Sequence, residues 1–478
     1  MHIHILGACG TFMGGVALLA KRAGHHVTGS DQHTYPPMST QLEAEGIVLT
    51  EGYSIEALQP QPDLVIIGNA LSRGNPAVEY VLNENMNYTS GPRWLGENYL
   101  RGKSVIAVAG THGKTTTSSL VAWILEQAGL KPGFLIGGVP HDFGFSARDG
   151  ERFFVVEADE YDTALFDKRA KFVHYRPHIA ILNNLEYDHA DIYPDLASIQ
   201  TQFHHLVRTI PGNGVIVNNG MDSNLESVIE KGCWSQLDTF SIDDEDAEWR
   251  VQLKSPGGRE LAFFHRGEPL GEIKWKMQGR HNAMNACAAL AACVAAGVKP
   301  ADVLKAMASF QGVSRRMELV EECNDIRVYD DFAHHPTAIR LTLEGLRRNV
   351  GNSRLLVALE PRSNTMKAGI HIDELGSALV AADRAWLLAG EGINWDPQEA
   401  LAPLEGRGRV VTRSADLLQQ IKDQVRPGDH VVFMSNGGFD AVPRRFCELL
   451  RAMEADKPPV GGDRATDRPS ENSASPGS

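Results

Sequence analysis

Short apolar runs alternate with longer amphipathic segments along most of the chain, a pattern typical of an α/β protein. Residues 3–6 predict a buried strand, which a glycine-rich turn and an apolar helix to about Arg22 follow. A second predicted strand ends with Gly29, Ser30 and Asp31, and a third covers residues 64–68. We therefore expect a first α/β domain over residues 1–102.

A second unit begins with an apolar strand at residues 105–109, a glycine turn and a helix over residues 116–128. Two further buried strands, at residues 153–157 and 179–183, end in polar residues. The carboxyl ends of strands form the ligand crevice in open α/β sheets, so we expect a binding site there. Predicted hairpins and an Ala-rich helix close this domain, which we place at residues 103–313.

The third unit starts with a predicted strand at residues 326–329 and again alternates strand with helix, so we expect a third α/β domain at residues 314–455. The tail, residues 456–478, is rich in Pro, Gly, Ser and charged residues without apolar periodicity. We expect this tail to be disordered and assign it no function. The later strands of the third domain are predicted at residues 354–359, 384–388, 408–411 and 430–434.

Length and composition support several globular domains. A chain of 478 residues suggests about three domains, and 42% hydrophobic against 22% charged residues is a globular composition. The apolar runs are shorter than the roughly 20 residues that cross a bilayer, and no secretory leader pattern begins the chain. We expect a cytoplasmic protein with no membrane partner.

Charge and cysteine content argue against several classes of partner and site. The net charge of -14, without a long basic run, argues against nucleic acid as a partner. The six cysteines form no C-x-x-C pair, so a reducing cytosol fits better than disulfides or structural zinc. Three His-His pairs lack further ligand spacing and are expected in loops or at the surface. They are His25-His26, His204-His205 and His334-His335.

A glycine-rich segment between the strand at residues 105–109 and the following helix predicts a phosphate-binding loop. Glycines let backbone N–H groups turn toward phosphate, Lys114 reaches the outer phosphates, and the Thr115 hydroxyl can hold magnesium. Val108 stands where the usual motif has glycine, so this loop is shorter than the standard form. The segment consists of Gly110, Thr111, His112, Gly113, Lys114, Thr115 and Thr116.

This shortened loop resembles the ATP loop of the Mur ligases and of folylpolyglutamate synthetases. Further segments resemble motifs of the same family in the same order, and together they span about residues 3–450. The resemblance implies three α/β domains: a Rossmann-like N-terminal domain, a central P-loop ATPase-type domain and a Rossmann-like C-terminal domain. The further segments are residues 157–162, 183–189, 279–285, 312–318 and 330–336.

The resemblance also implies a reaction, in which the γ-phosphate of ATP activates a carboxylate as an acyl phosphate that an amine then attacks. Thr115 and Glu157 would hold one Mg²⁺ ion, with His189 near a second. Lys114 and Arg316 would stabilise charge on the phosphoryl group. On this basis the catalytic residues are Lys114, Glu157, His189 and Arg316, and the nucleotide contacts are residues 110–116, Asn282, Asn285, Arg316 and Asp331, with adenine at Asn282 or Asn285 and ribose at Asp331.

One departure from the family pattern concerns a lysine that several Mur ligases carry, in carbamylated form, about fifteen residues beyond the histidine. The present chain has His204 at that place. The alanine-adding branch of the family lacks the same lysine, so the departure indicates a branch and leaves the expected activity intact.

The glycine turn of the first domain does not have dinucleotide-binding spacing, because positions 9 and 12 are Cys and Phe. It resembles the loop that holds uridine diphosphate in ligases acting on UDP-N-acetylmuramate, although a plain glycine turn is the alternative. The substrate contacts implied here are Gly7, Gly10, Thr11, Gly14, Ser30 and Asp31.

Residues 31–40, 358–367 and 434–439 resemble the family branch that adds a murein peptide to UDP-N-acetylmuramate. Arg362 and Asn364 are predicted substrate contacts, and Arg362 with Lys367 suits the carboxylates of a tripeptide. We expect ligation of L-Ala-γ-D-Glu-meso-diaminopimelate to UDP-N-acetylmuramate, in peptidoglycan recycling. The alternatives are an L-alanine-adding ligase and a non-catalytic or dehydrogenase-like dinucleotide binder, and the oligomeric state is left open.

Overall fold

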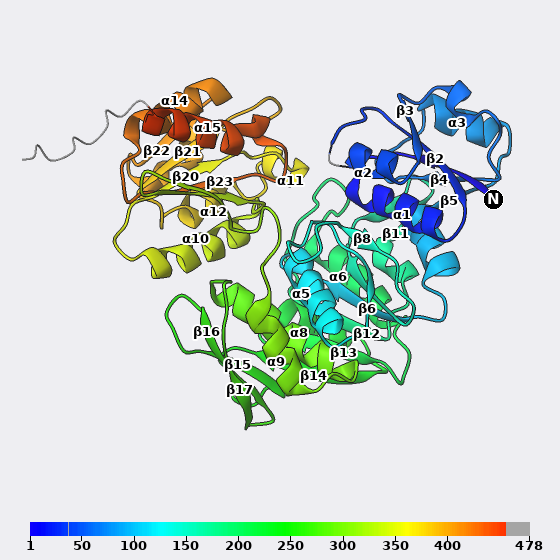
Figure 1. The fold of residues 1–478 in the computed structure, drawn as a ribbon, viewed down its shortest axis with the longest axis horizontal. Coiled ribbons are helices and arrows are strands. Elements are labelled where there is room, and N and C mark those ends of the chain that lie inside the picture. Colours follow the sequence, from blue (N-terminus) through cyan, green and yellow to red (C-terminus); the bar gives the residue numbers. More distant parts are fainter. Residues whose placement is uncertain (37, 456–478) are drawn as a thin grey trace, which may run out of the picture.

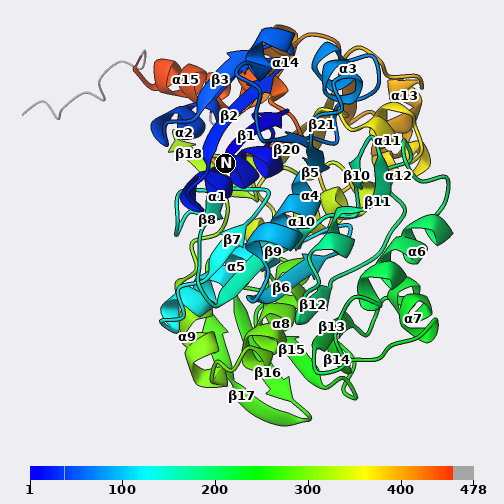
Figure 2. The same ribbon diagram turned by 90° about the vertical axis from the view of Figure 1, so that its right-hand side faces the viewer.

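The computed structural model describes residues 1–36 and 38–455, so the predicted tail at residues 456–478 lies outside the described residues. Three lobes are visible, and the N-terminal and C-terminal lobes stand on the same side of the central one (Figures 1 and 2). Each lobe contains a largely parallel sheet with helices packed on it, which confirms the predicted three-domain α/β class. Among the described residues, no helix is long and apolar enough to cross a membrane.

The N-terminal lobe has a five-stranded parallel sheet in the order β3-β2-β1-β4-β5. The order reverses beside β1, which places the glycine turn after β1 at a switch point of the sheet. Its elements are β1 (His2–Leu6), α1 (Thr11–Arg22), β2 (His26–Asp31), α2 (Met38–Ala44), β3 (Val48–Glu51), β4 (Leu64–Ile67), α3 (Pro76–Asn83), β5 (Tyr88–Ser90) and α4 (Gly91–Trp94).

The central lobe has a ten-stranded sheet in the order β17-β16-β15-β14-β13-β12-β6-β9-β7-β8, and β10 and β11 form a separate pair. Strand β6 pairs with β9 and β12, and its residues 105–109 are buried, as the apolar run predicts. The elements are β6 (Ser104–Ala109), α5 (Lys114–Gln127), β7 (Gly133–Leu135), β8 (Ala147–Arg148), β9 (Phe153–Ala158), β10 (Asp162–Ala164), β11 (Asp167–Ala170), β12 (Ile179–Leu182), α6 (Leu196–Val207), β13 (Val215–Asn219), α7 (Ser223–Glu230), β14 (Gln236–Ser241), β15 (Trp249–Leu253), β16 (Glu260–His265), β17 (Glu268–Lys274), α8 (Arg280–Ala295) and α9 (Pro300–Ser309).

The C-terminal lobe has a six-stranded sheet in the order β18-β19-β23-β20-β21-β22, parallel except for β18. Its strands at residues 384–388, 408–411 and 430–434 have the predicted bounds. The elements are β18 (Glu318–Cys323), β19 (Ile326–Asp331), α10 (Pro336–Val350), β20 (Leu355–Leu359), α11 (Asn364–Lys367), α12 (Ile372–Ala378), β21 (Arg384–Leu388), α13 (Pro397–Ala400), β22 (Gly408–Val411), α14 (Ser414–Gln424), β23 (His430–Met434) and α15 (Val442–Ala455).

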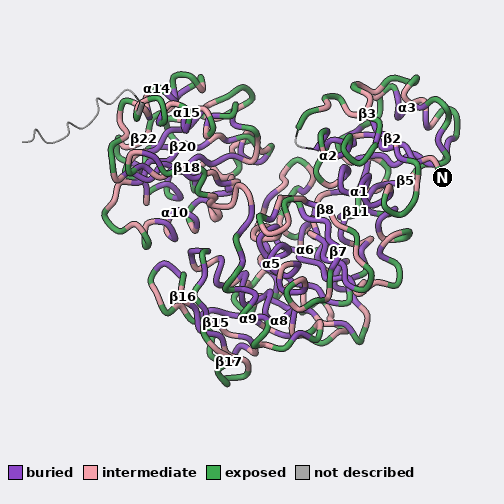
Figure 3. The backbone as a smooth tube through the Cα atoms, in the orientation of Figure 1, coloured by how far each residue is buried: buried purple, intermediate pink, exposed green. Residues whose placement is uncertain are grey.

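Burial follows the strands in all three lobes (Figure 3). One continuous cluster of buried apolar side chains joins the N-terminal and central lobes, reaching from Ile3 and Val16 to Leu135 and Phe203. The C-terminal lobe has separate clusters of its own. The first two lobes therefore share a core, whereas the third is independent in its packing.

Helix α5 begins at Lys114, two residues before the predicted start at residue 116. Gly113 precedes it with a φ of 79°, a left-handed conformation that glycine adopts without strain. This turn lets the helix start at once and brings Lys114 into its first turn, so the predicted boundary was wrong at this end.

Candidate active site

A cavity of about 550 Å³ lies between the central and C-terminal lobes and reaches the N-terminal lobe at Phe12. Its lining comes from the carboxyl ends of strands, the loops after them and the first turns of the helices α5, α8 and α10, as expected for an α/β sheet. Gly110 is not among the lining residues of the described structure. The predicted residues that line it are Thr111, His112, Gly113, Lys114, Thr115, Thr116, Glu157, His189, Asn282, Asn285, Arg316 and Asp331.

The loop between β6 and α5 needs glycine at both ends. Gly110 has a φ of 147°, and a Cβ atom there would lie 2.9 Å from the Cβ atom of Asn183. A Cβ atom on Gly113 would lie 2.6 Å from Oδ1 of Asn285. Between them, the backbone N–H of His112 donates to Oδ1 of Asn184 at 2.7 Å. The loop is thus closely packed against the segment after β12 and against α8.

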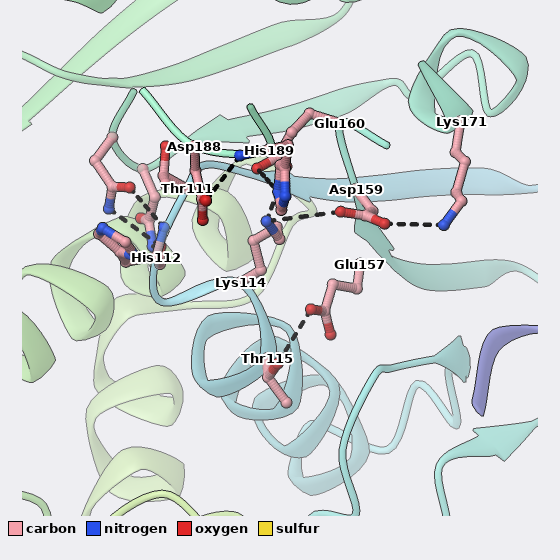
Figure 4. Close-up of polar contacts among 12 residues, drawn as sticks. Thr111, His112, Lys114, Thr115, Glu157, Asp159, Glu160, Lys171, Asp188 and His189 are labelled. Carbon is pink, nitrogen blue, oxygen red and sulfur yellow. Dashed lines mark hydrogen bonds and ion pairs between the residues drawn. The ribbon is translucent and has the colours of Figure 1, made fainter. Parts of the chain in front are cut away.

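Lysines and carboxylates alternate in a row of polar contacts at the cavity (Figure 4). Lys114 Nζ lies 2.8 Å from Oε2 of Glu160 and 3.8 Å from Oδ1 of Asp159. Lys171 Nζ lies 3.0 Å from Oδ2 of Asp159. At the other end, Nε2 of His189 lies 3.1 Å from Oε1 of Glu160. The row therefore runs Lys171, Asp159, Lys114, Glu160, His189, with opposite charges adjacent.

This alternation determines the protonation states. Burial alone would raise the pKa of Asp159, but Lys171 and Lys114 hold that pKa below its usual range. Burial would likewise lower the pKa of Lys114, yet Glu160 and Asp159 raise it above its usual value. The pKa of His189 is raised despite burial, because its ring is hydrogen-bonded to Glu160. Both carboxylates and Lys114 are thus charged at neutral pH.

Thr115 and Glu157 provide oxygen donors at the start of α5. Thr115 Oγ1 donates to Oε1 of Glu157 at 3.1 Å, and Nη2 of Arg316 donates to Thr115 Oγ1 at 2.9 Å. With bonds of about 2.1 Å, neighbouring oxygens around an octahedral Mg²⁺ ion lie about 3 Å apart, so this pair fits such an ion. The backbone N–H of Gly137 donates to the other carboxylate oxygen of Glu157, which orients it.

His189 belongs to a different group of potential ligands. Its ring nitrogen and carboxylate oxygens of Asp159 and Glu160 lie within 4.8 Å of one another. The sequence prediction named His189 but neither acid as a ligand. Their signal was present, because both acids directly follow the end of β9.

Asn282 and Asn285 lie in the first turns of α8, where each is buried. Asn285 Nδ2 donates to Oδ1 of Asn282 at 3.2 Å, and Asn183 Nδ2 donates to Oδ1 of Asn285 at 2.9 Å. Asp331 lies at the end of β19 and accepts backbone N–H groups from Met317 and Ala333. These residues line one cavity from two lobes.

The third histidine pair lies in a loop, between β19 and α10, which is one of the two places expected from the sequence, but this loop is covered by the central lobe. His335 is 4% exposed and caps the start of α10. Its Nδ1 lies 3.4 Å from Oε2 of Glu186, and Nε2 of His112 lies 3.3 Å from the same oxygen. Burial opposes ionisation of Glu186, but the hydrogen bond from His112 lowers the pKa of Glu186 to about 2. His335 is buried and His334 half-buried, because the two lobes meet there.

The residues predicted to contact UDP-N-acetylmuramate, the substrate that donates the carboxylate, gather at the carboxyl ends of β1 and β2. The backbone N–H of Gly7 donates to the carbonyl of Ser30, and that of Cys9 to the carboxylate of Asp31. The Ser30 side chain is buried and bonds His4, and a Cβ atom on Gly14 would lie 2.2 Å from Sδ of Met38. Ser30 and Gly14 therefore have packing roles too, and Gly10 and Thr11 begin α1 beside them.

The residues predicted to contact the tripeptide, which is the acceptor substrate, lie at the rim of the cavity. Arg362 Nη1 is 3.6 Å from Oε1 of Glu360, and its side chain is 54% exposed. Asn364 begins α11 and donates to Oδ2 of Asp191 in the central lobe at 3.0 Å. Their neighbours Ser363 and Thr365 line the cavity. Both predicted residues are thus beside the cavity, and Asn364 joins two lobes.

Comparison with known proteins places all three lobes in one family. Residues 2–102 match the family model "Mur ligase family, catalytic domain", residues 108–293 the Mur ligase middle domain, and residues 315–437 the "Mur ligase, glutamate ligase domain". The chain belongs to the Mur ligase family. As a Mur ligase it is an ATP-dependent enzyme that forms C–N bonds, which excludes the dinucleotide-binder alternative.

Individual Mur ligases differ in their similarity to this one. The chain is 52% identical over 462 residues to UDP-N-acetylmuramate–L-alanyl-gamma-D-glutamyl-meso-2,6-diaminoheptandioate ligase of Escherichia coli (strain K12), covering 95% of this chain and all of the relative. The crystal structure of a murein peptide ligase from Psychrobacter arcticus 273-4 has a TM-score of 0.74 at 45% identity, covering 94% and 98% of the two chains. UDP-N-acetylmuramate–L-alanine ligase of Arthrobacter sp. (strain FB24) is 32% identical over 437 residues, covering 89% and 90%.

Proposed function

We propose that this Mur ligase joins L-Ala-γ-D-Glu-meso-diaminopimelate to UDP-N-acetylmuramate, with ATP converted to ADP and phosphate. One observation carries the proposal: 52% identity over the full length of a ligase named for that tripeptide, against 32% for a ligase named for L-alanine. The activity serves the recycling of cell-wall peptide. We place it in the cytoplasm, where ATP and UDP-linked sugars are available.

Different cavity residues bind the phosphates, the adenine and the ribose of ATP. The N–H groups at the start of α5 and the side chain of Lys114 bind the outer phosphates, and Arg316 reaches the same place from the C-terminal lobe. Asn282 or Asn285 contacts adenine and Asp331 contacts ribose. We infer that positioning and charge stabilisation, rather than covalent chemistry of the protein, accelerate phosphoryl transfer to the donor carboxylate.

Thr115 and Glu157 are the residues we propose for one Mg²⁺ ion, and His189 with Asp159 and Glu160 for a second. The ion would neutralise charge on the phosphate oxygens as the phosphoryl group moves from ATP to the donor. The donor set supports the first site, since its two oxygens already lie at the spacing of neighbouring ligands.

The acceptor tripeptide carries several carboxylates, and we propose that it binds at the C-terminal rim of the cavity beside Arg362 and Asn364. Arg362 is exposed, and its charge is shared with Glu360 alone among the described ion pairs, so it is accessible to a ligand. Substitution Arg362→Ala is expected to raise the KM for tripeptide about 10-fold or more. An unchanged KM would remove Arg362 from the acceptor site.

Isotope transfer tests the reaction sequence. UDP-N-acetylmuramate labelled with ¹⁸O in its carboxylate is incubated with ATP, Mg²⁺ and tripeptide, and both products are analysed by mass spectrometry. An acyl phosphate requires one ¹⁸O atom in the released phosphate for each UDP-linked tripeptide formed. Product formation with unlabelled phosphate would contradict activation of the carboxylate by phosphorylation.

A further inference from the structure

Among the described residues, three Lys or Arg side chains line the cavity: Lys114, Lys171 and Arg316. The first and the last are proposed for the phosphates of ATP, whereas Lys171 has no role in that scheme. It follows β11 directly and is 7% exposed. Burial of a lysine is costly unless the ammonium group has partners, so its position needs an explanation.

Lys171 lies where the N-terminal and central lobes meet. Its Nζ is 5.6 Å from the ring centre of Phe12, which belongs to the first turn of α1 after the N-terminal glycine turn. The same Nζ is 5.5 Å from the ring centre of Tyr161 and 3.0 Å from Oδ2 of Asp159. Figure 4 shows Lys171 on the side of Asp159 opposite to Lys114. It therefore lies between the proposed donor-binding turn and the phosphate-binding lysine.

The charges around Lys171 leave it able to accept a further anion. Asp159 is its carboxylate partner among the described ion pairs, and Asp159 is shared with Lys114 at 3.8 Å. Two aromatic faces cover other sides of the ammonium group, and these attract a cation without neutralising it. An ammonium group has three donors, so a second carboxylate can bind while Asp159 holds the side chain in place.

We propose that Lys171 binds the carboxylate of UDP-N-acetylmuramate and holds it beside the phosphates bound at Lys114. The inference rests on the proposed function and adds a substrate contact to it. The reaction brings a carboxylate to a triphosphate, so two anions must approach closely. Lys171 stands at the end of the cavity nearest to the proposed uridine diphosphate site, and its charge offsets that repulsion on the donor side.

Comparing the binding of two nucleotides tests the contact between Lys171 and the carboxylate. UDP-N-acetylglucosamine has the same nucleotide and sugar ring as UDP-N-acetylmuramate but lacks the lactyl carboxylate. Dissociation constants of both are measured by calorimetry for the wild type, Lys171→Met and Lys171→Arg. The matched control is Lys168→Met, since Lys168 lies on β11 just before Lys171, its side chain is 71% exposed, and it bonds Asp162 instead of Asp159.

We expect Lys171→Met to weaken binding of UDP-N-acetylmuramate about 10-fold or more and to leave UDP-N-acetylglucosamine binding unchanged. Lys171→Arg should retain most of the preference, and Lys168→Met should match the wild type. Equal weakening of both nucleotides by Lys171→Met would show a merely structural lysine and overturn the inference. An unchanged preference in Lys171→Met would overturn it as well.

A second variant covers the event that Lys171→Met fails to fold because Asp159 keeps only its longer contact with Lys114. The double variant Lys171→Met with Asp159→Asn removes both charges, and it should lose the same preference for the carboxylate-bearing nucleotide. If the double variant keeps the wild-type preference, the inference is wrong. A wild type that binds neither nucleotide contradicts the proposed function itself, which is a distinguishable result.

Discussion

At the scale of single residues, the phosphate-binding loop has contacts that only glycine can make. Gly113 combines a left-handed φ with the close approach of Asn285 and Asn183, so both backbone and space exclude a side chain. Such a position can be recognised in the sequence, because two glycines follow a strand and the second stands directly before the lysine that begins a helix.

Substitution Gly113→Ala should lower kcat/KM for ATP about 100-fold, because the Cβ atom displaces the loop from the phosphates. Gly24→Ala is the matched control, since Gly24 has a φ of 87° and a Cβ atom there would meet no other atom within 4 Å. The control bears the same backbone strain and should keep its activity. Equal losses in the two variants would show that strain, rather than contact in the loop, is responsible.

Thr115 contributes a hydroxyl to both Glu157 and Arg316. We expect Thr115→Val to reduce kcat at saturating Mg²⁺ about 100-fold or more, because an ion near this site would lose an oxygen ligand. Thr115→Ser keeps the hydroxyl and should stay within a few-fold of the wild type. Steady-state phosphate release measures both, and a fully active Thr115→Val would remove this residue from the metal site.

Contacts between residues far apart in the chain could not be predicted from the sequence. Lys114 and Glu160 are 46 positions apart, and Lys171 and Asp159 are 12 apart, so their contacts depend on how β6, β9 and β11 lie in space. Local motifs therefore predicted Lys114 and His189. Asp159 and Glu160 lay in a recognised motif, but their place beside Lys114 and His189, like the position of Lys171, emerged only from the assembled site.

At the scale of elements, β1 and β2 are joined by side chains as well as by their ladder. Both ring nitrogens of His4 on β1 are used, Nδ1 with Thr28 Oγ1 at 2.8 Å and Nε2 with Ser30 Oγ at 3.1 Å. Burial lowers the pKa of His4 from 6.5 to about 4, with a smaller effect from His2. The imidazole is therefore neutral at pH 7.

This shift makes the N-terminal sheet sensitive to acid. Because the folded-state pKa is the lower one, the unfolded chain takes up the proton first, and stability falls as the pH drops from 6.5 toward about 4. Between pH 7 and pH 5, the stability advantage of the wild type over His4→Gln should shrink by about 2 kcal/mol. Calorimetry at both pH values measures it, and a constant advantage would contradict a depressed pKa.

Element bounds in the sheets could be predicted wherever an apolar run was continuous, as in β21 to β23. Short elements were missed: β7, β8, β10 and β11 are two to four residues long and carry little periodic signal. Since β11 leads directly into Lys171, this gap also hid a residue of the site.

At the scale of the whole molecule, packing differs between the two junctions. The N-terminal and central lobes share an apolar core, whereas the C-terminal lobe meets the central one through polar contacts such as Arg316 to Thr115 and Asn364 to Asp191. Polar interfaces between domains permit relative motion. The sequence indicated three α/β units, but the shared core depends on contacts between distant segments and could not be predicted from local patterns.

We expect the C-terminal lobe to open without nucleotide and to close when ATP and Mg²⁺ bridge the lobes. Small-angle scattering should give a smaller radius of gyration with a non-hydrolysable ATP analogue than without it. Arg316→Met removes the contact with Thr115 and should reduce that change. An identical radius with and without the analogue in the wild type would contradict closure by the nucleotide.

The central claim concerns which amine this Mur ligase joins to UDP-N-acetylmuramate. The most direct measurement is phosphate release from ATP and Mg²⁺ with that donor, comparing L-Ala-γ-D-Glu-meso-diaminopimelate, L-alanine and no acceptor. We expect release with the tripeptide and none above background with L-alanine. Release with L-alanine alone would assign the chain to the alanine-adding branch and contradict the account.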